Sequence, residues 1–113
     1  MKAAWFDAFG AARDVLRSGE QPAPVPGRGE VLVRLHTSGV NPSDVKKRAG
    51  QFDNLLDGGL VIPHSDGAGV IEAVGPDAGD AVAPGDRVWV YQAQYARRLG
   101  TAAEFVAIDA RRA

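Results

Sequence analysis

The stretch IPHSDGAGVIEAVG, residues 62–75, decides the fold of this 113-residue chain. Its second half, Gly69–Gly75, is a short apolar segment opened and closed by glycine, which is typical of a β-strand. Working outward, the same kind of segment recurs at Val31–Thr37, Asp86–Tyr91 and Ala103–Ile108. Several short strands with turn signals between them predict an antiparallel barrel or sandwich.

The strand expected over Val31–Thr37 carries the clearest pattern. Alternation puts Val31, Val33 and Leu35 on one face, and Arg34 and His36 on the other. This spacing predicts a half-buried strand whose apolar face lies on the core. Two further strands are expected near the N-terminus, over residues 3–6 and 15–18.

One segment departs from the strand pattern and predicts a single short helix over Asn41–Gly50. Asn41 is a good N-cap, Pro42 occupies the first helical position, and Asp44 places an acid in the first turn. Three bases follow in the last turn, and Gly50 ends the segment. Each choice suits the helix dipole and the free amides at the helix start.

Composition narrows the class of protein. The length suits one domain, residues 1–113, and 45% hydrophobic residues suit a globular core. A net charge of −1 argues against a broad nucleic-acid surface. The chain has no Cys, which excludes disulfides and thiolate metal ligands, and no apolar run that could span a membrane. We expect a soluble, cytoplasmic protein with no membrane or nucleic-acid partner.

Four stretches in register carry a family resemblance: Ser38–Asp44, Ile62–Gly69, Val70–Gly75 and Pro84–Val88. Their order and spacing resemble the N-terminal, GroES-like substrate domain of medium-chain dehydrogenases/reductases. The branch that the chain resembles is that of the zinc-free quinone oxidoreductases related to zeta-crystallin. The resemblance implies a mainly β fold with one or more short helices, arranged as a GroES-like, partly open antiparallel β-barrel.

The resemblance also bears on zinc. Zinc-using members of this superfamily place a Cys and a His at the positions of Asn41 and Ser65. Neither a carboxamide nor a hydroxyl replaces thiolate and imidazole as Zn²⁺ ligands. His64 is next to one of these positions, but a site built from His36, His64 and carboxylates would lack the soft ligands. We therefore expect no metal.

By resemblance, the complete enzyme transfers a hydride from NADP(H) to a small-molecule quinone or α,β-unsaturated carbonyl. Such a reaction needs orientation and charge stabilisation from side chains. The positions that match the family motif give three groups of expected site residues. They are Asn41 and Asp44 as catalytic residues, Asn41, Lys46 and Ser65 as cofactor-binding residues, and Phe52, Tyr91 and Tyr95 as the aromatic wall of the substrate site. Many relatives have Tyr at the position of Lys46, so the polar lining differs here.

Structural explanations compete with these roles. Asn41 is an adequate helix cap without any function, Asp44 is explained by the helix dipole, and Ser65 closes a turn. Lys46 suits a solvated helix end. Strand aromatics, here Tyr91, Trp89 and Phe105, belong more often to the core than to a cleft. The run Gly67–Gly69 continues as a strand, so it does not form a dinucleotide-binding loop.

In the resembled enzymes a doubly wound (Rossmann) cofactor domain follows, and we expect it to be absent from this chain. The chain alone would then bind NADPH weakly and be inactive, and its uncovered surfaces would favour a homo-oligomer. Two alternatives stay open: a stand-alone binding or interaction module without catalysis, and a co-chaperonin whose docking loop would be residues 50–62. The dehydrogenase motifs make the co-chaperonin the weaker of the two.

Overall fold

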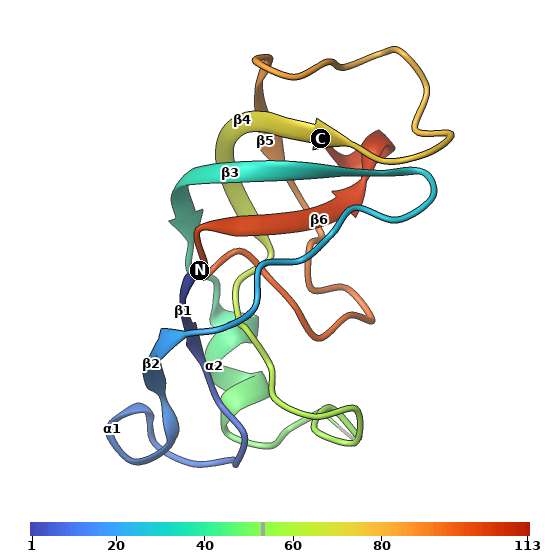
Figure 1. Cartoon of the computed structure of the whole chain (residues 1–113). Helices are drawn as coiled ribbons and strands as arrows, with labels where there is room; N and C mark the ends of the chain where they lie inside the picture. The colour runs from blue at the N-terminus through green and yellow to red at the C-terminus, as the bar shows by residue number, and fades with distance from the viewer. Residues whose placement is uncertain (53) are drawn as a thin grey trace.

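The structure is a computed structural model that describes residues 1–52 and 54–113. It is mainly β and contains two sheets in which every pairing is antiparallel (Figure 1). One sheet has two strands, β1 and β2, and the other has four strands in the order β5-β4-β3-β6. The strands are β1 (Lys2–Trp5), β2 (Arg17–Glu20), β3 (Glu30–Gly39), β4 (Asp66–Val74), β5 (Arg87–Val90) and β6 (Phe105–Asp109), and the helices are α1 (Ala12–Val15), α2 (Pro42–Arg48) and the 3₁₀ turn η1 (Ala110–Arg112).

The two sheets do not close into one barrel. Isolated bridges join β1 and the residue after it to segments outside both sheets, Ala3 with Ala103 and Phe6 with Val61, and a parallel bridge joins Ile62 to Leu99. Figure 1 shows the ribbon of β1 and β2 below the larger sheet, with α2 beside it. The predicted fold class, mainly β with short helices and an incompletely closed antiparallel barrel, is confirmed.

The main core lies on one face of the four-stranded sheet. Val31 and Val33 of β3 are fully buried, and Val33 is paired with Ile71 on β4 and with Val106 on β6. Full burial of such a side chain contributes about 1.5–3 kcal/mol. On the opposite face Arg34 is exposed and forms an ion pair with Glu72 at 3.4 Å. The alternation predicted for this strand is confirmed.

Strands β3 and β4 approach each other closely at Gly69. A Cβ on this residue would lie 2.0 Å from the carbonyl oxygen of Arg34, so no larger residue fits without moving the backbone. The register of the pair shifts between Leu35 and Thr37, one residue further along β3. This irregularity precedes the point where the chain leaves the sheet and enters α2.

Two expectations about the strands are wrong in detail. Val15 ends α1 instead of opening a strand, because it packs in a second core cluster with Phe6 and Val61. The strand begins later, at Arg17. Trp89 was expected in the core but is 74% exposed, because it lies on the outer face of β5, whereas Val90 is buried on the inner face.

The remaining elements keep their predicted type. The helix predicted over residues 41–50 is α2, and β4 starts earlier than expected, at Asp66. Among the residues that the structure describes, no helix is long and apolar enough to cross a membrane.

Candidate functional site

The site predicted from the sequence centres on the start of α2, where the chain leaves β3. Asn41 precedes the helix in an extended conformation, and its Nδ2 donates a hydrogen bond of 2.7 Å to Oδ2 of Asp66. Asp66 is the first residue of β4. The carboxamide of Asn41 therefore connects the helix start to the neighbouring strand.

Asp44 lies in the first turn of α2 and is only 4% exposed. Its Oδ2 accepts the backbone N–H of Asn41 at 2.7 Å, and its Oδ1 accepts the backbone N–H of His64 at 3.2 Å. Burial of a carboxylate is costly unless hydrogen bonds replace its hydration, and these two bonds supply that replacement. Capping of the helix start explains only the first contact, since the second fixes a segment 20 residues away.

Ser65 is half-buried at the end of the segment that Asp44 holds. Its carbonyl oxygen accepts the backbone N–H of Ala93 at 2.9 Å, which attaches the loop of residues 91–98 to this side of the molecule. The Ser65 hydroxyl makes no hydrogen bond within the described part of the chain. This leaves it free to meet a bound molecule.

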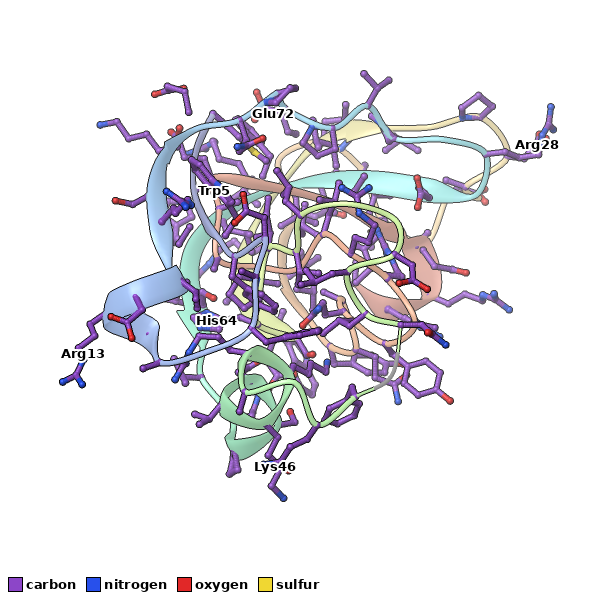
Figure 2. The ribbon with its side chains drawn as sticks, turned by 90° about the horizontal axis from the view of Figure 1, so that it is seen from below. Trp5, Arg13, Arg28, Lys46, His64 and Glu72 are labelled. Atoms are coloured by element: carbon purple, nitrogen blue, oxygen red, sulfur yellow. The ribbon has the colours of Figure 1, made fainter. Side chains whose placement is uncertain are left out.

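The two lysines of α2 face different surroundings. Lys46 extends outward from the helix in Figure 2 and is exposed. Lys47 is half-buried, its Nζ donates to Oε1 of Gln94 at 3.3 Å, and it lies 5.8 Å from the centroid of the Phe52 ring. Lys47 therefore connects α2 to the loop of residues 91–98, a contact that the sequence reasoning missed.

The three aromatic residues predicted to line the substrate site are all accessible. Phe52 is 42% exposed, Tyr91 43% and Tyr95 65%. Lys47 lies near the Phe52 ring and also contacts Gln94, which belongs to the same loop as Tyr95. Tyr91 instead packs beside Trp89, with ring centroids 6.2 Å apart, and its hydroxyl donates to the carbonyl oxygen of Arg111 at 3.4 Å. The structure thus brings the loop of Tyr95 toward Phe52 through Lys47, whereas Tyr91 contacts the C-terminal turn.

The loop of residues 91–98 combines several unfavourable features. Gln92 and Ala96 both adopt left-handed backbone conformations, with φ of 53°. Between them, Gln94 is 2% exposed, and its Nε2 is buried without a hydrogen-bond partner among the described residues. Such conformations and unpaired donors each cost roughly 1–3 kcal/mol and concentrate at functional sites. No signal in the sequence singled out Gln94.

His64 was considered from the sequence only as a substitute metal ligand. It adopts a left-handed conformation with φ of 78°, which places its ring toward β3. His64 is half-buried, whereas Lys46 is exposed. Its Nδ1 lies 2.7 Å from Oγ of Ser38, which in turn lies 2.9 Å from Oγ1 of Thr101.

Comparison with known proteins decides the family. The sequence model of the alcohol dehydrogenase GroES-like domain matches residues 27–113. The chain belongs to this family. The expected resemblance to the N-terminal domain of medium-chain dehydrogenases/reductases is confirmed, since the curated relatives include quinone oxidoreductases.

Two relatives and two solved structures illustrate the similarity. The chain is 37% identical over 91 residues to the quinone oxidoreductase of Homo sapiens, a match that covers 79% of this chain and 26% of that protein. It is 35% identical over 89 residues to the chloroplastic quinone-oxidoreductase QR1 of Triphysaria versicolor, covering 78% and 27%. The chain thus spans about a quarter of the length of these relatives. The quinone oxidoreductase from Coxiella burnetii superimposes with a TM-score of 0.85 at 30% identity, covering 96% of this chain and 34% of that one.

The second structure is that of mycobacterial Rv1454c complexed with NADPH. It superimposes with a TM-score of 0.83 at 32% identity, and the match covers 99% of this chain and 32% of that chain. Since the similarity covers nearly the whole chain, this GroES-like domain shares its fold with part of an NADPH-binding protein.

A large groove of the GroES-like domain lies away from the predicted site. A groove of about 710 Å³ runs over the outer face of the four-stranded sheet and is lined by residues of β3, β4 and β5, among them His36, Gly69, Arg87 and Trp89. None of the predicted site residues borders it. Size alone therefore does not identify the site in this domain, and the hydrogen-bonded residues around Asp44 are the better candidates.

Proposed function

We propose that this GroES-like domain is the substrate-binding part of an NADPH-dependent oxidoreductase that reduces a quinone or an α,β-unsaturated carbonyl without zinc. The main support is the buried carboxylate of Asp44, which holds Asn41 and His64 in fixed positions beside Ser65. Such a network pre-organises polar groups at positions that the family resemblance predicts to belong to the site. The relatives named as quinone oxidoreductases supply the class of reaction.

In this proposal Asn41 and Asp44 act at the reacting end of the cofactor. Asn41 offers a carboxamide, which both donates and accepts, to the nicotinamide or its ribose. Asp44 keeps Asn41 in place. Ser65 contributes its hydroxyl and Lys46 an exposed ammonium on the cofactor side. Phe52, Tyr91 and Tyr95 contact the flat substrate.

The described residues fit only one end of NADPH. Residues 67–69 lie within strand β4 and so do not form the glycine loop that opens a helix and holds a pyrophosphate. The first helical residue of α2 is Pro42, which has no N–H to offer. Bound NADPH supplies the hydride, and this chain orients the acceptor. We therefore propose that the chain alone is inactive and needs a separate cofactor domain.

Zinc independence is supported by the donor set. Asn41 and Ser65 stand at the ligand positions of the zinc enzymes, and both are poor ligands for Zn²⁺. Over residues 1–52 and 54–113, no group of three or more His, Cys, Asp or Glu side chains is arranged to hold a metal ion. The reaction would then depend on positioning and hydrogen bonds.

The proposed function is tested by complementation. NADPH is titrated into the chain alone, and into its mixture with a separately expressed cofactor domain of a related reductase, with fluorescence of Trp5 and Trp89 as the signal. We expect NADPH binding and quinone reduction only in the mixture. Micromolar NADPH affinity of the chain alone would contradict the expected weak binding, and quinone reduction by the chain alone would contradict its inactivity. No binding and no turnover in either case would favour a stand-alone interaction module.

Paired variants make the complementation specific. Asn41→Ser keeps a good helix cap but removes the carboxamide, and should lower quinone reduction by about tenfold, which corresponds to about 1.4 kcal/mol. Arg13→Ala changes an exposed residue remote from the site and should leave the rate unchanged (Figure 2). Equal rates for Asn41→Ser and the original chain would remove Asn41 from the proposal.

We also propose that the chain self-associates through β5. This strand lies at the edge of the four-stranded sheet and carries Trp89, which is 74% exposed. Exposed edge strands with apolar side chains tend to pair with other chains. Light scattering at rising concentration should show a dimer or larger species, and Trp89→Ser should shift it toward the monomer. A monodisperse monomer of the original chain at high concentration would overturn this proposal.

A further inference from the structure

A chain of hydrogen bonds borders a second hollow that none of the roles above uses. His64 Nδ1 lies 2.7 Å from Ser38 Oγ, and Ser38 Oγ lies 2.9 Å from Thr101 Oγ1. Thr101 Oγ1 lies 2.7 Å from the carbonyl oxygen of Asp66. All three side chains line a hollow of about 300 Å³ between β1, β3 and the segment of residues 101–103.

The direction of this chain follows from the number of protons available. A carbonyl oxygen only accepts, so the Thr101 hydroxyl must donate to Asp66. Because that uses its single proton, Thr101 accepts from the Ser38 hydroxyl. The Ser38 proton is then used as well, so Ser38 must accept from the Nδ1–H of His64. The neutral imidazole of His64 is therefore protonated on Nδ1 and carries a lone pair on Nε2.

The Nε2 atom is available to a ligand. It forms no hydrogen bond within the described residues, and among these the one buried side-chain nitrogen or oxygen without a partner is Nε2 of Gln94. The Nε2 of half-buried His64 is therefore accessible. A cavity of about 50 Å³ beside His64 suits little more than water. His64 also lines the hollow of about 300 Å³, which has room for a larger molecule.

His64 is also held rigidly. Its backbone N–H donates to Asp44 Oδ1 at 3.2 Å, and its carbonyl oxygen accepts the N–H of Thr101 at 2.9 Å. The ring is fixed by Ser38. An acceptor that is pre-organised in this way loses little entropy when a ligand binds.

The lining of the hollow restricts the chemistry of the ligand. Ala4, Leu35, Ala102 and Ala103 form an apolar wall, and the ionisable residues that line the hollow are His36 and His64. A charged ligand would meet no carboxylate, ammonium or guanidinium partner there. We propose that this hollow binds a small neutral alcohol or phenol, whose hydroxyl donates to Nε2 of His64 and whose apolar part lies on the alanine wall.

The tautomer is tested first, by ¹⁵N NMR of the full chain at about pH 8, where an ordinary imidazole is neutral. We expect the signals of Nδ1–H and of an unprotonated Nε2. Ser38→Ala removes the acceptor of the Nδ1 proton and should move the tautomer toward Nε2–H. Thr37→Ala, a neighbour in the same hollow, should leave it unchanged. Nε2–H in the original chain would overturn the proposal.

Binding is tested with phenol as the probe and anisole as the matched ligand without a hydroxyl proton. We expect phenol to shift the His64 Nε2 signal and to bind about tenfold more tightly than anisole, the value of one hydrogen bond. Ser38→Ala should lower the affinity of the chain for phenol to its affinity for anisole. Equal affinities of the two ligands for the original chain would refute the proposal. Both measurements need no cofactor, so they are independent of quinone reduction.

Discussion

Replacement of Asp44 by alanine tests whether one buried carboxylate holds the candidate site together. The side chain is 4% exposed and accepts two backbone N–H groups, from Asn41 at 2.7 Å and from His64 at 3.2 Å. A hydrogen bond to a charged group contributes about 1.5–3 kcal/mol, and the longer bond belongs at the lower end of that range. Relief from burying the charge offsets part of this loss. We therefore expect Asp44→Ala to lower the free energy of unfolding by about 2–3 kcal/mol.

This loss is measurable without abolishing the fold. Domains of this size have stabilities of about 5–15 kcal/mol, so most molecules stay folded. The midpoint of thermal unfolding should fall by roughly 8–15 °C, followed by circular dichroism. Asp80→Asn, at an exposed position, serves as the control and should stay within about 0.5 kcal/mol.

A loss of less than about 0.5 kcal/mol, the size of an ordinary surface substitution, would show that Asp44 does not hold the site together. Asp44→Asn separates charge from shape. The amide keeps one acceptor oxygen but turns an NH₂ group toward one of the two N–H donors, so its effect should approach that of alanine. If Asp44→Asn left the free energy of unfolding unchanged, the two N–H donors would not both need a carboxylate oxygen.

Three further predictions concern other parts of the chain. Gly100→Ala should lower the free energy of unfolding, measured by urea titration, by about 3 kcal/mol or more, because the new Cβ would lie 2.1 Å from the His64 carbonyl oxygen. Gly79→Ala is the control and should cost only about 1 kcal/mol, because nothing lies within 4 Å of the new Cβ. Phe6→Ala, at a fully buried position of the second core cluster, should cost about 3–5 kcal/mol in the same assay. The side-chain hydrogen bond from Arg111 holds the pKa of Asp109 well below its usual range. This contact should therefore stabilise the turn η1 fully above the ordinary Asp pKa of about 4, and be lost as the pH falls further. Arg111→Ala should return the pKa of Asp109, followed by NMR, toward the usual value, and an unchanged pKa would contradict the assignment.

Much of the strand pattern could be predicted because it depends on neighbouring residues. The alternation at Val31, Val33 and Arg34 is a property of successive residues in an extended chain, and the structure confirms it. The start of α2 was predictable for the same reason. The prediction failed where tertiary contacts outweighed local preference: Val15 joined a distant cluster, and Trp89 turned outward on an edge strand.

The candidate site was predictable only in part. The family motif drew attention to Asn41, Asp44 and Ser65, and the structure places the first two in one hydrogen-bonded network with His64. It did not draw attention to Lys47 and Gln94, because their contact joins residues 47 positions apart. The roles of all the predicted site residues, Asn41, Asp44 and Ser65 included, stay predictions.

The sequence by itself determined the class of fold, the position of the main helix and the family, because periodicity, capping residues and motif spacing are local properties of the chain. Only the tertiary structure decided that Asp44 is buried and accepts two backbone N–H groups, and that His64 contacts Ser38, which in turn contacts Thr101. The physical reason is distance along the chain. Ser38 and Thr101 are 63 residues apart, so their contact exists only after the sheet has formed.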